Sequence, residues 1–171
     1  MKNLFKVAIV SSVVALSAFL IFGIGSAADV FPPFTTQDID GKEVTDAIFA
    51  DNKLTVVNIW TTWCPPCIGE MPDLGRLARS MPEGSQLIGL VLDAYDPGAL
   101  DKAQRILTKA DAKFSQLLPS DEMSLLLERV EAIPTTIFVD AGGKIVGQSL
   151  VGSRSEKAYR AEIEKILKAI P

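Results

Sequence analysis

The sequence alternates between short apolar runs of strand type and longer segments with helical periodicity. Two runs, Leu54–Trp60 and residues 85–92, are apolar almost throughout, which is typical of strands buried on both faces. Residues 65–80 follow a helical pattern, and residues 97–110 place their apolar side chains on one helical face. This alternation of strands and helices predicts an α/β domain.

The other segments complete the predicted sheet and its covering helices. Short strand candidates on either side of Asp38-Ile39-Asp40-Gly41 indicate an N-terminal β-hairpin. Residues 135–140 and 144–150 are predicted as two antiparallel strands joined by a glycine-containing turn. Residues 121–129 are predicted to be helical, and Ser153 is expected to cap a last helix. We therefore expect a mixed sheet covered by helices on both faces, with an N-terminal hairpin and a central helical insertion.

The first 28 residues have the pattern of a targeting segment. Lys2 and Lys6 precede an uncharged run of 18 residues from Val7 to Ile24, and small residues at 26–28 offer a cleavage site. The run is also close to the roughly 20 residues that span a bilayer, so an uncleaved membrane anchor is the alternative. In either case the flanking charges predict that residues 29–171 form an extracytoplasmic domain, held to a membrane only through the N-terminal segment.

The amino-acid composition excludes several classes of function. The chain has 171 residues, about the size of one domain, and a formal net charge of −4. Without the leader, 15 basic residues face 21 acidic ones, so no basic surface for nucleic acid is expected. The sequence contains no histidine, which removes histidine bases and histidine ligands for haem or copper.

The only two cysteines, Cys64 and Cys67, lie three positions apart directly after the first buried strand. A zinc site would need about four ligands, and the chain has no histidine and no third cysteine. A static disulfide across so short a loop would constrain the unfolded chain little. The spacing therefore predicts a redox-active pair that needs no metal or organic cofactor.

Prolines place the pair at a helix N-terminus. Pro65 and Pro66 fit a first helical turn, where their missing N–H groups would have no acceptor, so Cys64 lies at or just before the helix start. The unpaired N–H groups there favour a thiolate on Cys64. We expect Cys64 to be the nucleophile and Cys67 the residue that resolves a mixed disulfide on it.

These motifs resemble the thioredoxin superfamily. Trp63-Cys64-Pro65-Pro66-Cys67 is similar to its active-site motif, and Ile133-Pro134-Thr135-Thr136 resembles its cis-proline loop. The order of elements from about residue 31 to residue 170 is similar to the extracytoplasmic TlpA/ResA-like branch. The resemblance implies a thioredoxin-like sheet, a thiol-disulfide oxidoreductase activity, and substrate contacts at Trp63, Ile133 and Pro134.

The resemblance also implies a role for Glu70. In cytoplasmic thioredoxins a buried aspartate two residues before the strand's tryptophan assists proton transfer, but Asn58 stands at that position here and cannot titrate. Glu70 matches a glutamate of the TlpA/ResA-like group and lies nearly one helical turn after Cys67, on the same side of the helix. We expect Glu70 to accept the proton of Cys67; a solvated glutamate at the helix start is the alternative.

Three other functions are alternatives to a reductase of this branch. A CcmG-like reductant for cytochrome c maturation usually has an acidic residue where Thr135 stands. A thiol peroxidase has a Thr-x-x-Cys motif, which Thr61 and Cys64 match, but Cys67 argues for a dithiol enzyme. A Sco-like copper carrier would need a histidine. The expected partners are protein thiols or disulfides and a membrane or exported electron donor.

Overall fold

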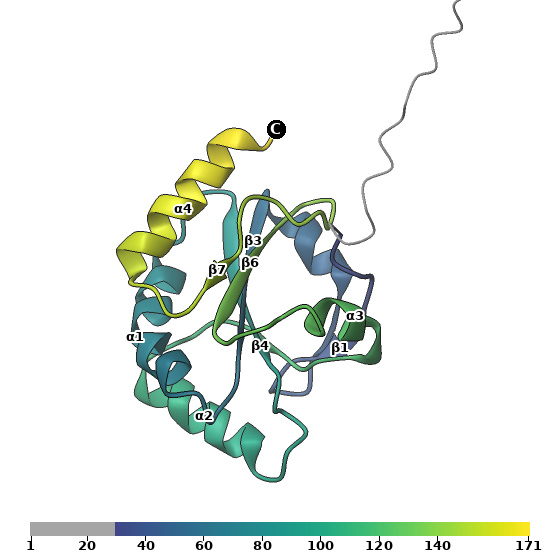
Figure 1. Cartoon of the computed structure of the whole chain (residues 1–171), viewed down its shortest axis with the longest axis vertical. Helices are drawn as coiled ribbons and strands as arrows, with labels where there is room; N and C mark the ends of the chain where they lie inside the picture. Colours follow the sequence, from purple (N-terminus) through teal and green to yellow (C-terminus); the bar gives the residue numbers. More distant parts are fainter. Residues whose placement is uncertain (1–29) are drawn as a thin grey trace, which may run out of the picture.

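A five-stranded sheet forms the centre of the computed structural model, which describes residues 30–171 (Figure 1). Its order is β5-β4-β3-β6-β7, with β3 (Leu54–Trp60) and β4 (Ser85–Val91) parallel and β6 (Thr135–Asp140) antiparallel to β3. The predicted targeting segment at residues 1–28 lies outside the described residues. Within the described range, no helix is long and apolar enough to cross a membrane.

The edges of the sheet are formed by two very short strands. β5 (Gln116–Leu117) runs parallel to β4, and β7 (Leu150–Val151) runs antiparallel to β6. The predicted N-terminal hairpin is confirmed as a separate antiparallel pair, β1 (Thr35–Gln37) and β2 (Glu43–Thr45). The mixed sheet predicted from the sequence is therefore present, and the hairpin lies beside it rather than in it.

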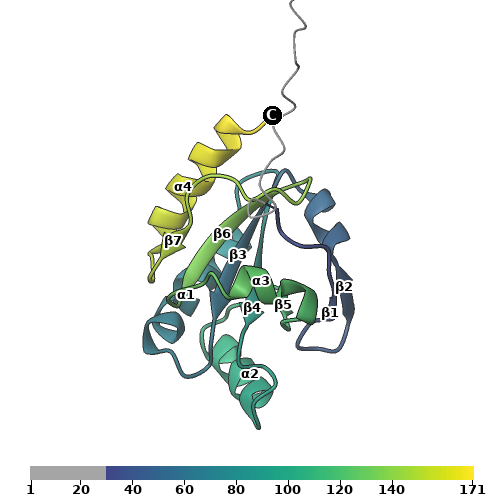
Figure 2. The ribbon, with the colours of Figure 1, turned by 45° about the vertical axis from the view of Figure 1, so that its right-hand side comes forward.

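Helices cover both faces of the sheet, as expected. Three long helices pack against one face: α1 (Pro65–Arg79), α2 (Ala99–Lys109) and α4 (Glu156–Ala169). The other face is covered by shorter elements together with the hairpin: η2 (Asp46–Asp51), η3 (Asp121–Met123) and α3 (Ser124–Leu127). Figure 2 shows the hairpin and α1 on opposite sides of the sheet. The central insertion between β4 and β6 holds α2, β5, η3 and α3.

Alternate side chains of β3 supply the two hydrophobic cores. Val56 and Trp60 pack with the long helices, whereas Val57 and Ile59 pack with a cluster of three phenylalanines near the hairpin. Every residue of β3 is buried, which explains why its sequence is apolar on both faces. The strand that precedes the cysteines is therefore fixed from both sides.

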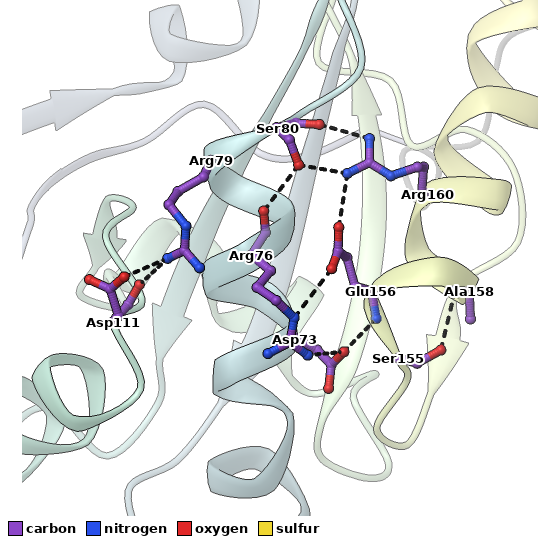
Figure 3. Close-up of polar contacts among 9 residues, drawn as sticks. All are labelled: Asp73, Arg76, Arg79, Ser80, Asp111, Ser155, Glu156, Ala158 and Arg160. Carbon is purple, nitrogen blue, oxygen red and sulfur yellow. Dashed lines mark hydrogen bonds and ion pairs between the residues drawn. The ribbon is translucent and has the colours of Figure 1, made fainter.

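Polar contacts hold α4 against α1 (Figure 3). The Asp73 carboxylate accepts the N–H of Glu156 at 2.9 Å, and the Glu156 carboxylate accepts bonds from Arg76 at 3.3 Å and Arg160 at 3.0 Å. Arg160 also donates to the carbonyl of Ser80 at 2.7 Å. Exposed ion pairs add little stability individually, but several together fix the relative position of the two helices.

Two predicted boundaries are wrong. The segment 144–150 is not one strand, because Gly147 adopts a φ of 68° and leaves isolated bridges at Lys144 and Ile145 and, at its end, the short β7. The last helix is capped by Ser155, not Ser153, and begins at Glu156. Ser155 has an extended backbone (φ −75°, ψ 156°), and the N–H of Glu156, which a Ser153 cap would accept, is held by the Asp73 carboxylate.

Gly89 on β4 gives a stability prediction. A Cβ at this position would overlap the side chain of Gln116, which accepts a hydrogen bond from Nε1 of the buried Trp60 at 2.9 Å. Gly89→Ala is expected to lower the free energy of unfolding by about 1–3 kcal/mol, because Gln116 must shift or Trp60 loses its partner. Chemical denaturation measures the change. Gly69→Ala is the control: nothing lies near its Cβ, and the helix should gain up to about 1 kcal/mol. Equal stabilities of the two variants would contradict the prediction.

Candidate active site

The cysteine pair lies where β3 ends and α1 begins. Cys64 is the N-cap of α1, Pro65 and Pro66 occupy the first turn, and Cys64 and Cys67 are joined by a disulfide. The prolines fit there because the first N–H groups of a helix have no acceptor within it. The predicted position of the pair is confirmed.

The helix N-terminus acts directly on Cys64. The backbone N–H of Cys67 donates to Sγ of Cys64 at 3.2 Å, a contact that stabilises negative charge on that sulfur once the disulfide opens. Cys64 is 3% exposed and Cys67 is fully buried. The environments of the two sulfurs therefore differ, and of the two cysteines only Cys64 retains any solvent exposure.

The proline loop faces Cys64. The peptide bond between Ile133 and Pro134 is cis, and the carbonyl oxygen of Ile133 lies 3.8 Å from Sγ of Cys64. The Pro134 carbonyl accepts the N–H of Gly152 at 2.8 Å. Within residues 30–171, the backbone N–H and C=O of Ile133 have no backbone hydrogen-bond partner. Ile133 thus presents free main-chain groups beside the reactive sulfur.

A shallow groove of about 400 Å³ lies between the turn that precedes Cys64 and the loop that precedes Pro134; neither cysteine lines it. Trp63, which is 62% exposed, and Ile133 contribute apolar surface to it. Three acidic residues also line it, namely Asp93, Asp96 and Glu131. The groove is suited to an extended peptide segment that passes along Trp63 and Ile133.

A buried carboxylate fixes the turn that leads into the cysteines. Both Asp93 oxygens accept the N–H of Thr62 at 3.0 Å, and one accepts its hydroxyl at 2.6 Å. Asp93 follows β4, so this contact ties the ends of the two central parallel strands together. The position of Trp63 and Cys64 is therefore set by β4 as well as by β3.

Glu70 is buried, not solvated. It is 2% exposed, and its carboxylate accepts hydrogen bonds from Nδ2 of Asn58 at 3.0 Å, from the hydroxyl of Tyr159 at 2.9 Å and from the N–H of Arg154 at 3.0 Å. Loss of hydration raises the pKa of Glu70 above its usual range, while these three hydrogen bonds act in the opposite direction. The alternative of a surface glutamate is wrong.

The comparisons with known proteins agree with this geometry. The family model described as Redoxin matches residues 26–167. The chain belongs to the Redoxin family. Thiol-disulfide oxidoreductase ResA of Bacillus anthracis is 26% identical over 136 residues, covering 79% of this chain and 75% of that protein. Thiol:disulfide interchange protein DsbE of Haemophilus influenzae is 28% identical over 132 residues, covering 77% and 68%.

A solved structure confirms the fold. The thioredoxin family thiol:disulfide interchange protein from Chlorobium tepidum aligns with a TM-score of 0.67 and 23% identity, over 81% of this chain and 96% of that one. This Redoxin-family domain is a thiol-disulfide oxidoreductase, and its TlpA/ResA-like resemblance is confirmed. Enzymes of this kind act on protein thiols or disulfides.

The sequence did not identify several residues around this Redoxin-family site. In the sequence, Tyr159 is one of the regularly spaced apolar positions of the last helix, and Thr136 and Arg154 lie far from the cysteines in the chain. The structure brings all three to Glu70 or to its hydrogen-bond partners. The only signal was a tyrosine among aliphatic residues on a buried helix face, because a buried tyrosine hydroxyl usually needs a polar partner.

Proposed function

We propose that the chain is an exported protein-disulfide reductase in which Cys64 is the nucleophile, Cys67 the resolving cysteine and Glu70 its proton acceptor. The observation that carries the proposal is the position of Cys64. Its sulfur caps α1, accepts the N–H of Cys67 and faces Ile133 across 3.8 Å. A sulfur stabilised as a thiolate beside free backbone groups is suited to attack an extended peptide's disulfide.

The proposed cycle consists of two exchange steps. The Cys64 thiolate attacks a substrate disulfide, forming a Cys64–substrate bond and releasing the other substrate sulfur as a thiolate. Cys67 then gives its proton to Glu70, and its sulfur attacks Cys64, which forms the Cys64–Cys67 disulfide and releases the second substrate sulfur. The substrate gains two electrons that the dithiol loses. An exported dithiol donor restores Cys64 and Cys67 by the reverse exchange.

Trp63, Ile133 and Pro134 are proposed to bind the substrate. The unpaired main-chain groups of Ile133 would pair with an extended segment, as in strand addition, while Trp63 provides an exposed apolar wall of the groove. The cis bond at Pro134 directs the Ile133 carbonyl toward Cys64 in this arrangement. Specificity then depends on the residues that flank the substrate cysteine.

The reducing direction rests on the residues between the cysteines. Pro65 and Pro66 bring neither charge nor N–H donors to Cys64, so the reduced form gains less stabilisation than it would from a cationic neighbour. The leader at residues 1–28 supports export, whether it is cleaved or remains as a membrane anchor.

A reductant for cytochrome c maturation, the CcmG-like alternative, is compatible with the similarity to protein DsbE. The peroxidase alternative gains less support. In the described residues the Thr61 hydroxyl has no hydrogen-bond partner and so does not orient Cys64.

The test compares two substrates under identical conditions. Residues 30–171, reduced beforehand, are expected to reduce insulin disulfides catalytically and to consume hydrogen peroxide no faster than a free dithiol. Alkylation of the protein in its native host, with the full chain expressed, then shows whether Cys64 and Cys67 are mostly reduced. A mostly oxidised pair would make the enzyme an oxidase, and fast peroxide consumption would make it a peroxidase.

A further inference from the structure

The Glu70 carboxylate is surrounded by donors from three parts of the fold. Asn58 on β3 donates to one oxygen at 3.0 Å, while Tyr159 on α4 and the N–H of Arg154 donate to the other at 2.9 and 3.0 Å. An ionised carboxylate that is 2% exposed is costly unless its lone pairs are used in this way. The surroundings are therefore complementary to the ionised form of Glu70.

The same donors form a closed ring through Thr136 on β6. Nδ2 of Asn58 donates both to Glu70 and to Oγ1 of Thr136 at 3.1 Å, and Oγ1 lies 3.1 Å from the Tyr159 hydroxyl. Tyr159 has one hydroxyl proton, and with Glu70 ionised that proton goes to the carboxylate. Thr136 must then donate to the tyrosine oxygen. With Glu70 ionised, each hydroxyl in the ring therefore has one donor direction: Thr136 donates to Tyr159, and Tyr159 donates to the carboxylate.

We propose that Tyr159 is a positioning residue of the redox reaction, whose hydroxyl orients Glu70 and keeps its buried carboxylate ready to accept the proton of Cys67. The proposal rests on the function proposed above and adds the last helix to the site. Tyr159 is fully buried, and its own pKa is raised by burial first and by Glu70 second, so it stays a neutral donor. Its role is to act through Glu70, not to touch the substrate.

The rigid contact between α1 and α4 makes this positioning possible. Asp73 holds the first N–H of α4 at Glu156, and Arg160 binds the carbonyl at the end of α1 (Figure 3). Tyr159 lies between Glu156 and Arg160 on α4, so both contacts flank it. The distance from its hydroxyl to Glu70 is therefore fixed by the packing of the two helices.

Few neighbouring groups could add a pH dependence of their own to that of Glu70. Arg154, on the loop before α4, is the charged neighbour, and its guanidinium is held by the carbonyls of residues 151–153. Arginine stays protonated over the whole working range. β3 and β6 present only the uncharged Asn58 and Thr136, and Cys67 lies on α1 itself. An observed pH dependence of resolution thus belongs to Glu70 and Cys67 as a pair.

Tyr159→Phe tests the proposal, because it removes one oxygen and keeps the buried ring. Loss of the hydrogen bond raises the pKa of Glu70 further, so less carboxylate is present at a given pH. The readout is the release of thionitrobenzoate from a preformed mixed disulfide on Cys64, which reports the attack by Cys67 alone. The apparent midpoint of release should move to higher pH, with a loss of rate on the order of tenfold on the acid side and recovery at alkaline pH.

Two comparisons separate positioning from structure. Tyr95→Phe is the matched control, since the only other tyrosine is exposed and bonds to the Pro119 carbonyl, and its release profile should equal the wild type. In a Glu70→Gln background, Tyr159→Phe should cause no further shift of the profile. A shift of the same size in that background, or no shift in the single variant, would overturn the role of Tyr159.

A failure of the proposed function has a different signature. If Glu70→Gln releases thionitrobenzoate with the wild-type profile, Glu70 is not the acceptor, whatever Tyr159 does. If Tyr159→Phe does not fold, Thr136→Val replaces it, because it removes the donor to the tyrosine oxygen while keeping the branched shape. It should move the midpoint in the same direction by a smaller amount, and an unchanged midpoint would count against the proposal.

Discussion

Replacement of Cys67 with alanine should stop turnover and leave the enzyme covalently attached to its substrates, whereas replacement of Cys64 should stop turnover without trapping them. The reason is the inequality of the two sulfurs. Cys64 is 3% exposed, faces Ile133 and accepts the N–H of Cys67, which would stabilise its thiolate, while Cys67 is fully buried. Insulin reduction by either variant should fall to the uncatalysed rate.

Trapping is measured by non-reducing electrophoresis of acid-quenched extracts. Cys67→Ala should give bands of higher mass that disappear on reduction, and the double variant Cys64→Ala/Cys67→Ala should give none. Equal trapping by the two single variants would show that the roles of nucleophile and resolving cysteine are not assigned correctly.

Glu70→Gln should slow the resolving step by about a hundredfold at neutral pH, within the usual range for losing a general base. The part of the pH profile that Glu70 sets should also disappear, because glutamine cannot titrate, and only the dependence due to the Cys67 thiol should remain. Thionitrobenzoate release over a range of pH measures both effects. A rate reduced equally at every pH, with the profile unchanged in shape, would indicate a structural change instead.

The fold should tolerate Glu70→Gln. The glutamine oxygen can accept from Tyr159 and Arg154, while its NH₂ faces Asn58, whose Oδ1 has no hydrogen-bond partner within residues 30–171. A half-turn of the Asn58 amide would direct that oxygen to the new donor. The turned NH₂ then lies where Oδ1 now has no partner, so the change leaves one buried donor unpaired but requires no movement of the backbone.

The same variant should change how stability depends on pH. The pKa of Glu70 is higher in the folded chain, so the folded chain binds more protons than the unfolded one between the two values. The stabilisation is complete below the unfolded pKa and is lost as the pH rises through the folded pKa. The measurement is denaturation of the disulfide form, in which the cysteines do not titrate. As the pH rises from acid to neutral, the free energy of unfolding of Glu70→Gln should increase relative to that of the wild type. A constant difference would contradict this.

Local sequence patterns were reliable where the chain itself defines the geometry. Pro65 and Pro66 determine where α1 can begin, and that in turn makes Cys64 an N-cap. The apolar run of β3 could only be a strand buried on both faces, and the structure has it at the sheet centre with the predicted bounds. The proline loop at Ile133 and Pro134 was found through the superfamily motif, since sequence spacing says nothing about a contact across 69 positions.

Boundaries failed where a tertiary contact competes with local preference. Ser153 and Ser155 are both good caps by residue type, but the N–H of Glu156, which Ser153 would cap, is taken by Asp73 on α1, so Ser155 caps the helix. The strand expected at 144–150 is broken by Gly147, whose left-handed backbone the local alternation does not reveal.

The sequence by itself determined the chemistry of this protein: one cysteine pair at a helix N-terminus, and no histidine. Only the tertiary structure decided the state of Glu70. Its spacing from Cys67 fits a surface glutamate as well as a buried one, and the choice depends on Asn58, Arg154 and Tyr159. These residues come from β3, the loop before α4, and α4, and only the packing of these elements brings their donors together. The protonation of a buried group depends on that three-dimensional environment, which no local pattern encodes.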